Sequence, residues 1–245
     1  MASVEKYTEP KLMNQIKHIE RQFKTNSNKD IVEELTAKNY SLSPVREISS
    51  KQAYLRRKSE LYAYGRDNLI CGFGWVVTAP GDLPESKEKE FFQASYDFIT
   101  DRYGGPENVI SAQVHYDEGV RDQDGNLIAG RPHMHVLMIP VVPDRNAAHW
   151  QEEKICCKEV INKADLRSWH DDYQAYLDSV PGLNARVKTG KTASQGGNIS
   201  VAQYKQITKS TLERQQEIQR EKGMRNLTND RWHGTVAHEV GERWR

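Results

Sequence analysis

Apolar residues recur at helical spacing in several long stretches of the chain, because side chains three and four positions apart share one face of a helix. The helices predicted from this pattern run over residues 11–24, 85–103 and 166–180, with a basic one over 46–68 and a polar one over 200–222. Gly104-Gly105-Pro106 ends the second of these segments, and Pro181-Gly182 ends the third.

Short apolar runs rich in β-branched and aromatic residues predict strands between the helices. They cover residues 39–42, 72–79, 108–116 and 133–141, with a further edge strand over 154–161 and a last strand over 183–188. Turn-forming residues at 122–126 separate two of these strands by the length of a hairpin connection. Helices and hairpin-connected strands that alternate in this way predict an α+β domain with a mostly antiparallel sheet.

Charge changes this picture only locally. Lys and Arg number 35 against 34 Asp and Glu, so the net charge is +1 and no overall basic field indicates a nucleic-acid partner. Residues 46–66, however, contain six basic and two acidic side chains, interleaved with Tyr54, Tyr62 and Tyr64. Such a mixture is able to bind phosphates and stack on bases, although a solvated helix face has the same composition.

Membrane and secreted classes are not supported by the sequence. The longest apolar run, 136–142, contains Pro140 and is too short to cross a bilayer, and no basic-then-apolar signal segment opens the chain. Cys71, Cys156 and Cys157 match neither a disulfide framework nor a zinc-finger spacing. We expect them to be reduced and structural in a cytoplasmic protein, with the adjacent pair on opposite faces of a strand.

A histidine pair gives the sharpest chemical signal. His133 and His135 would project from the same face of a buried strand, about 7 Å apart. His115 ends the preceding strand, and a hairpin would bring it beside them, with Asp117 and Glu118 at the same end. Three imidazoles with open coordination positions favour Mn²⁺, Co²⁺, Ni²⁺ or Zn²⁺ over Mg²⁺.

An open metal site of this kind polarises a carbonyl or phosphoryl oxygen. A hydrolase would use the metal to activate water, whereas a phosphoryl-transfer enzyme would attack with a side chain. Two nucleophile candidates lie outside the triad. His18 is on the first predicted helix, on the same face as Arg21, and Tyr40 is in a short predicted strand.

Several separate motifs then agree in order and spacing with a known family. They are His18-Ile19-Glu20-Arg21, Asn26-Ser27-Asn28-Lys29-Asp30-Ile31, Asn39-Tyr40-Ser41-Leu42, His115-Tyr116-Asp117-Glu118 and Pro132-His133-Met134-His135. Together they resemble the Mob/Pre (MobV) plasmid mobilisation proteins, also called plasmid recombination enzymes. These are relaxases of the HUH endonuclease superfamily.

The resemblance implies a central, five-stranded antiparallel sheet flanked by helices. It also implies nicking of one strand at a plasmid transfer origin, with the 5′ phosphate left covalently on the enzyme. The implied metal ligands are His115, His133 and His135, and the implied catalytic residues are His18 as nucleophile, Glu118 to orient or deprotonate it, and Arg21 to hold a phosphate or stabilise the transition state.

The implied cofactor is a divalent metal ion, with Mn²⁺ favoured and Mg²⁺, Co²⁺, Ni²⁺ or Zn²⁺ as alternatives. The implied partner is origin-of-transfer DNA, single-stranded around the nick, with a coupling protein or relaxosome accessory proteins in the bacterial cytoplasm. The residues expected to contact DNA are Arg56, Arg57, Lys58, Asn28 and Tyr40. Residues 1–222 would form the relaxase domain, and 223–245 a tail without an interpretable pattern.

Residues 119–131 separate the Asp-Glu pair from the histidine pair by more than the family's usual few residues, so we expect them to form a protruding loop. Three other functions compete with the histidine relaxase. Tyr40 would be the nucleophile of a tyrosine-type HUH nickase, either a rolling-circle replication initiator or a single-strand transposase. The triad would activate water in a small-molecule metallohydrolase, and a non-catalytic DNA-binding repressor would keep only the fold.

Overall fold

The computed structural model describes residues 2–23, 31–121 and 127–187, together with Ser210, Arg214 and Glu217. All the helices and strands with described bounds lie in one compact unit, Met1–Thr189. The second unit, Gly190–Arg245, contains only the three separate described residues, so the helix over 200–222 and the domain boundary at 222 stay predictions. Within the described ranges, no helix is long and apolar enough to cross a membrane.

A five-stranded antiparallel sheet forms the centre of the first unit, as predicted. Its strand order is β1 (Ala2–Thr8), β3 (Ile70–Thr78), β7 (His133–Met138), β4 (Val109–His115) and β2 (Tyr40–Ser41). The strand that carries the histidine pair is the middle one, and it pairs with β3 on one side and β4 on the other. A continuous apolar run is expected of a strand covered on both faces, so the central place of β7 confirms that interpretation.

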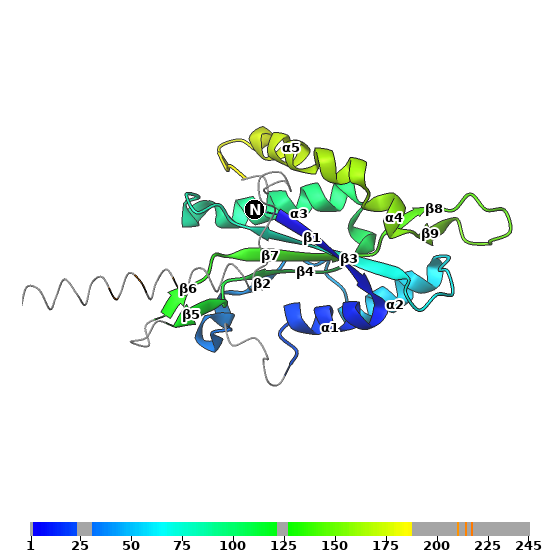
Figure 1. Cartoon of the computed structure of the whole chain (residues 1–245), viewed down its shortest axis with the longest axis horizontal. Coiled ribbons are helices and arrows are strands. Elements are labelled where there is room, and N and C mark those ends of the chain that lie inside the picture. The colour runs from blue at the N-terminus through cyan, green and yellow to red at the C-terminus, as the bar shows by residue number, and fades with distance from the viewer. Residues whose placement is uncertain are drawn as a thin grey trace, which may run out of the picture. The chain divides into compact units, whose positions relative to one another are not determined.

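Two layers of helices cover the sheet (Figure 1). α1 (Glu9–Ile19) and α2 (Ser50–Glu60) lie on one face, while α3 (Glu85–Arg102) and α5 (Lys163–Ser179) lie on the other. The core beneath α3 and α5 is aromatic, and Trp75 of β3 stacks on Trp169 of α5 with ring centroids 3.9 Å apart. The core beneath α1 and α2 is smaller and mainly aliphatic.

The alternation of side chains along β7 determines which of the two cores each side chain enters. Met134, Val136 and Met138 point into the core beneath α3 and α5, and Leu137 belongs to the core beneath α1 and α2. Because successive strand residues point to opposite faces, His133 and His135 lie on the same side as Leu137. The histidine pair therefore lies on the face that α1 and α2 cover.

The remaining elements connect or extend this framework. They are two 3₁₀ helices, η1 (Glu33–Lys38) and η2 (Pro106–Asn108), a β5 (Gly119–Arg121)–β6 (Leu127–Ala129) hairpin, a β8 (Val141–Pro143)–β9 (Glu153–Ile155) hairpin, and the short α4 (Cys157–Val160). The two hairpins extend in opposite directions, beyond the two ends of the central sheet (Figure 1). The first of them is the protrusion expected between the two histidine-bearing strands.

Several sequence-based boundaries were wrong. The strand predicted over 154–161 ends at Ile155, because Cys157 begins a helical turn, so Cys156 and Cys157 do not alternate across a strand. Residues 183–187 are irregular rather than a strand, and Lys188 lies outside the described residues. β1 was not predicted at all, because this edge strand is mostly polar and buries only Ala2 and Tyr7 fully.

The basic helix is shorter than predicted. The sequence pattern suggested residues 46–68, whereas α2 spans Ser50–Glu60. Ser49 starts it with a capping box, in which the Ser49 side chain accepts from the Gln52 N–H and the Gln52 side chain accepts from the Ser49 N–H. Tyr54 is the residue by which this helix enters the core.

The stacked tryptophans give a direct test of the larger core. We expect Trp169→Ala to lower the free energy of unfolding by about 3–5 kcal/mol, the usual cost of truncating a buried aromatic residue. The matched control is Leu166→Ala on the same helix, since that side chain is 41% exposed and should cost much less. Urea unfolding of both variants would measure the difference, and equal losses would contradict this packing.

Candidate active site

Three histidines meet where β4 ends and β7 begins. His115 is the register partner of His133 across the antiparallel pair, so the long connection leaves the predicted hairpin pairing intact. One ring nitrogen from each of His115, His133 and His135 lies within 4.8 Å of the other two. Their ring centroids are 5.0–5.5 Å apart. The structure thus brings together all three predicted ligands.

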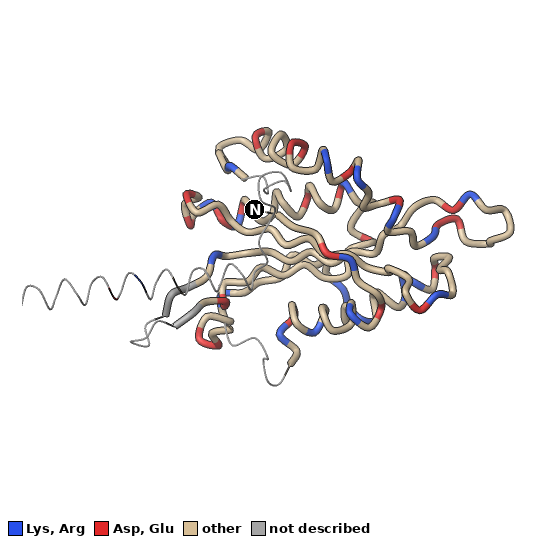
Figure 2. The backbone as a smooth tube through the Cα atoms, in the orientation of Figure 1, with Lys and Arg blue, Asp and Glu red and all other residues tan. Residues whose placement is uncertain are grey.

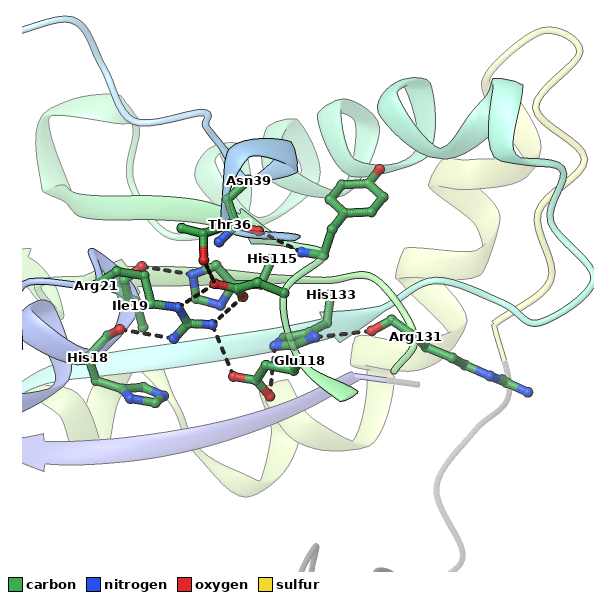
Figure 3. Close-up of polar contacts among 11 residues, drawn as sticks. His18, Ile19, Arg21, Thr36, Asn39, His115, Glu118, Arg131 and His133 are labelled. Carbon is green, nitrogen blue, oxygen red and sulfur yellow. Dashed lines mark hydrogen bonds and ion pairs between the residues drawn. The ribbon is translucent and has the colours of Figure 1, made fainter. Parts of the chain in front are cut away.

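In His115 and His133, a hydrogen bond to a main-chain carbonyl determines which ring nitrogen is free (Figure 3). His115 donates from Nε2 to the Ile19 carbonyl at 2.7 Å, and His133 donates from Nδ1 to the Arg131 carbonyl at 3.1 Å. Such bonds leave a lone pair on the other nitrogen of each ring. His115 Nδ1 and His135 Nε2 are in fact buried without a hydrogen-bond partner.

Burial keeps the rings of His115 and His135 neutral. It lowers the pKa of His115 to about 3 and the pKa of His135 well below its ordinary value. Two buried ring nitrogens without a hydrogen-bond partner are costly in a protein interior unless something binds them. The donor set of three imidazoles that converge at one point fits a divalent transition-metal ion.

His18 faces this cluster from the last turn of α1. Its ring lies edge-on to that of His135, with centroids 6.3 Å apart. Leu12, Ile16 and Ile19 anchor α1 in the core, which fixes the direction of its final turn. Burial, together with the charge of Arg21, lowers the pKa of His18, so the ring is neutral at physiological pH. The first nucleophile candidate is therefore beside the predicted ligands.

Tyr40 lies on the other side of the sheet. It pairs with Val114 of β4, a residue of the core beneath α3 and α5, and its ring packs beside that of Tyr116. Lys89 of α3 is 6.0 Å from the Tyr40 ring centroid. Burial raises the pKa of the Tyr40 hydroxyl to about 12. The structure does not bring this second candidate to the histidine cluster.

Arg21 is held by two carboxylates next to His18. Its Nε and Nη2 atoms donate to the two oxygens of Asp117 at 3.0 and 2.6 Å, and Nη2 also donates to Glu118 at 3.2 Å. Asp117 is fully buried. Burial alone would raise the pKa of this carboxyl, but the hydrogen bonds and charge of Arg21 lower it to about 2.

Glu118 lies between Arg21 and the histidine cluster. Its Oε2 atom is 3.7 Å from Nε2 of His133, while Oε1 contacts Arg21 (Figure 3). The insertion starts directly after Glu118 and returns at Gly130, whose N–H donates to the Glu118 carbonyl at 2.6 Å. The main chains approach so closely that a Cβ on Gly130 would collide with that carbonyl oxygen. The return of the insertion thus fixes the main chain of Glu118.

The predicted DNA contacts differ in their availability. Arg57 pairs with Glu153 at 2.6 Å and donates to Asn108, and Lys58 pairs with Glu9 at 2.7 Å. The Arg56 side chain is 78% exposed and has only a long contact with Glu60. Asn28 lies outside the described residues.

The two helical layers carry opposite charge (Figure 2). α1 and α2 together contain six basic and two acidic side chains, whereas α3 and α5 contain five basic and nine acidic ones. The sequence total of +1 conceals this difference. The histidine cluster lies on the basic side, which is the side that attracts a polyanion.

Sequence reasoning missed several residues that support the site. Asp117 had been noted only for its place beside Glu118, yet it binds Arg21 with both oxygens. Thr36 donates to Asp117, and the Asn39 side chain accepts from the N–H of Tyr116. Asn39 lies in one of the motifs that carried the resemblance, but nothing in its sequence context indicated this contact.

Curated plasmid recombination enzymes are similar to this chain over most of its length. The chain is 28% identical to plasmid recombination enzyme type 1 of Staphylococcus aureus over 91% of its own length and 51% of that protein. It is 25% identical to a plasmid recombination enzyme of Streptococcus agalactiae over 84% of its length and 38% of that protein. The chain thus spans about half, or less, of these curated relatives.

A solved structure matches this chain over almost the entire length of the solved domain. It is the MobM relaxase domain bound to plasmid pMV158 oriT DNA, in a Mn-bound crystal structure. The TM-score is 0.65 and the identity 25%, over 84% of this chain and 97% of that one. The model of the plasmid recombination enzyme family, Mob/Pre, matches residues 1–206. The chain therefore belongs to the Mob/Pre family of plasmid recombination enzymes.

Proposed function

We propose that this protein is a histidine relaxase, which nicks one DNA strand at a plasmid transfer origin and keeps the 5′ phosphate on His18. The observation that carries the proposal is the place of His18, whose neutral ring faces three converging imidazoles on the basic side of the sheet. The domain that matches in structure is bound to oriT DNA, which supports DNA as the substrate.

His115, His133 and His135 would hold a divalent cation through one ring nitrogen each, and the main-chain hydrogen bonds of His115 and His133 determine which nitrogen is free in those two rings. Mn²⁺ is favoured, because imidazole ligation suits it better than Mg²⁺ and because the matching relaxase domain is Mn-bound. When bound, the metal supplies Lewis-acid polarisation of the scissile phosphate. The attack on the phosphate falls to a side chain of this chain.

In the proposed reaction, a neutral ring nitrogen of His18 attacks the phosphorus and forms a P–N bond as the bond to the 3′ oxygen breaks. The leaving 3′ oxygen takes a proton from water and becomes a hydroxyl. The proton left on the His18 ring passes to solvent or to the Glu118 carboxylate. Lowering of the His18 pKa by burial favours the attacking form at pH 7.

The DNA would lie along the α1 and α2 layer, single-stranded around the nick. Among the three basic residues predicted to contact DNA, Arg56 is exposed, whereas Arg57 and Lys58 are engaged within the protein. The relaxase domain is proposed to extend over residues 1–222, and the protein to act in the bacterial cytoplasm. Conjugative mobilisation would add a coupling protein or relaxosome accessory proteins as partners.

The identity of the nucleophile is tested by the covalent adduct. We expect single-stranded oligonucleotides from the transfer origin of the parent element, incubated with Mn²⁺, to yield a protein–DNA adduct on a denaturing gel. His18→Ala should abolish it, and Tyr40→Phe should retain it, because Tyr40 faces the other helical layer. An adduct lost only in Tyr40→Phe would instead support a tyrosine-type nickase.

The ligand set is tested by metal binding itself. His133→Ala should weaken Mn²⁺ binding, followed by electron paramagnetic resonance, more than about 100-fold, since even the loss of a supporting residue costs 10–100-fold. His149→Ala is the matched control, because that ring stacks on Tyr62 instead of joining the cluster. Chelation should stop nicking. Unchanged Mn²⁺ affinity in His133→Ala would remove this residue from the ligand set.

The basic helix is tested by salt dependence. Arg56→Gln should reduce the slope of log affinity against log salt by about 0.7, the value for one phosphate contact on a single strand. Lys87→Gln on α3 is the control from the acidic layer and should leave the slope unchanged. Arg57→Gln should lower the free energy of unfolding instead of the slope. A slope unaffected by Arg56→Gln would exclude that side chain from the DNA interface.

A further inference from the structure

The backbone of Arg21 adopts a conformation that few side chains tolerate. Its φ angle is +53°, and Asn184 is the only other non-glycine residue with a positive φ in the described chain. Arg21 follows the end of α1, where the Gln22 N–H donates to the Lys17 carbonyl and the Arg21 N–H donates to the His18 carbonyl. This is a Schellman motif, whose left-handed position is normally occupied by glycine.

The arginine side chain makes contacts that glycine would not. Four hydrogen bonds leave its guanidinium, two to Asp117, one to Glu118 and one to the His18 carbonyl. A guanidinium has five N–H donors, so one remains. The Arg21 side chain is 11% exposed. Most of its donor capacity is therefore used within the protein rather than offered to a phosphate.

Asp117 connects the same arginine to two further elements. Its carboxylate accepts from the Thr36 hydroxyl of η1 at 3.1 Å, and its carbonyl accepts from the Val32 N–H at 2.8 Å. Asp117 also follows β4 by two residues, and therefore lies between His115 and Glu118. Arg21 and Asp117 thus join the end of α1 to the end of the strand that carries a predicted metal ligand.

The last turn of α1 contacts the cluster by a second route. The Ile19 carbonyl accepts from Nε2 of His115, and Ile19 directly follows His18. A shift of this turn would move the nucleophile and disturb the free nitrogen of His115 together. The left-handed backbone is the geometry that lets one residue close the helix and still reach Asp117 with its side chain. Strain kept beside an active site commonly has such a purpose.

We infer that Arg21 and Asp117 form a positioning pair. The pair sets the end of α1, and with it His18, against the histidine cluster, and it orients Glu118 between Arg21 and His133. This inference rests on the proposed relaxase function and gives Arg21 a role different from direct phosphate binding. Asp117, which is buried, acts through Arg21 and Glu118 and does not touch DNA.

Four variants test the pair: Arg21→Gly, Arg21→Lys, Asp117→Asn and the double variant Arg21→Gly/Asp117→Asn. Glycine suits the left-handed backbone, and the double variant leaves no buried charge unpaired. Lysine keeps the charge but lacks the planar fork that binds both oxygens of Asp117. Asn184→Gly is the control, since it places glycine at the other left-handed position without touching the site.

We expect each of the four variants to lower the rate of adduct formation at saturating DNA about 100-fold, the typical cost of a displacement near 1 Å. DNA affinity and its salt slope should stay unchanged. The double variant should be no slower than the slower single variant, because both substitutions break one pair. Circular dichroism and thermal unfolding would confirm that the double variant is folded, and Asn184→Gly should react at the wild-type rate.

Two outcomes would overturn the inference. A wild-type rate in Asp117→Asn would show that the carboxylate positions nothing. Weaker DNA binding with a smaller salt slope in Arg21→Gly, at an unchanged saturated rate, would make Arg21 a phosphate contact.

Absence of an adduct in the wild-type protein would instead contradict the proposed function. The pair would then be judged by Mn²⁺ affinity, which the double variant should lower 10–100-fold through the contact between Ile19 and His115. Unchanged Mn²⁺ affinity would then reject it.

Discussion

The alternation of side chains along the central strand β7 is the constraint on which the site depends. Odd-numbered residues from His133 to Leu137 point toward α1 and α2, and even-numbered ones fill the aromatic core on the other face. The apolar half of this pattern is fixed by packing, because a shift of one residue would move its side chains out of the aromatic core and turn the two histidines into it. The direction of the His133 and His135 side chains follows from this alternation. Their placement is therefore as secure as the core itself, although neither imidazole contributes to the core.

The same alternation separates the two nucleophile candidates. Tyr40 is paired with Val114, whose side chain enters the core beneath α3 and α5, so its hydroxyl lies across the sheet from the histidine cluster. His18 reaches the histidine cluster from a helix that packs on the same face of the sheet. The charges of the layers follow the same division, since the acidic helices cover the tyrosine side. Geometry and electrostatics thus favour histidine over tyrosine at this site for independent reasons.

The convergence of His115, His133 and His135 could be predicted from the sequence, because it depends on strand periodicity and on one hairpin. The two-residue spacing of His133 and His135 determines a shared face, and the antiparallel return brings His115 opposite His133. Which basic residues are paired within the protein, and which are exposed, could not be predicted in this way. Arg56 and Arg57 are neighbours in sequence, yet only Arg57 reaches Asn108 and Glu153, which are more than 50 residues away. Such pairings depend on the tertiary fold.

The end of α1 shows why a motif can identify a residue and still miss its role. His18 and Arg21 are spaced as neighbours on a helix, but the helix ends at Ile19, and the left-handed turn redirects the arginine. A buried carboxylate such as Asp117 needs a charged partner, because leaving it unpaired is strongly unfavourable. Arg21 supplies that partner through a backbone conformation that disfavours its own side chain. Pairing the buried Asp117 carboxylate therefore outweighs the backbone preference against arginine at this position. The left-handed turn that results holds His18 beside the histidine cluster.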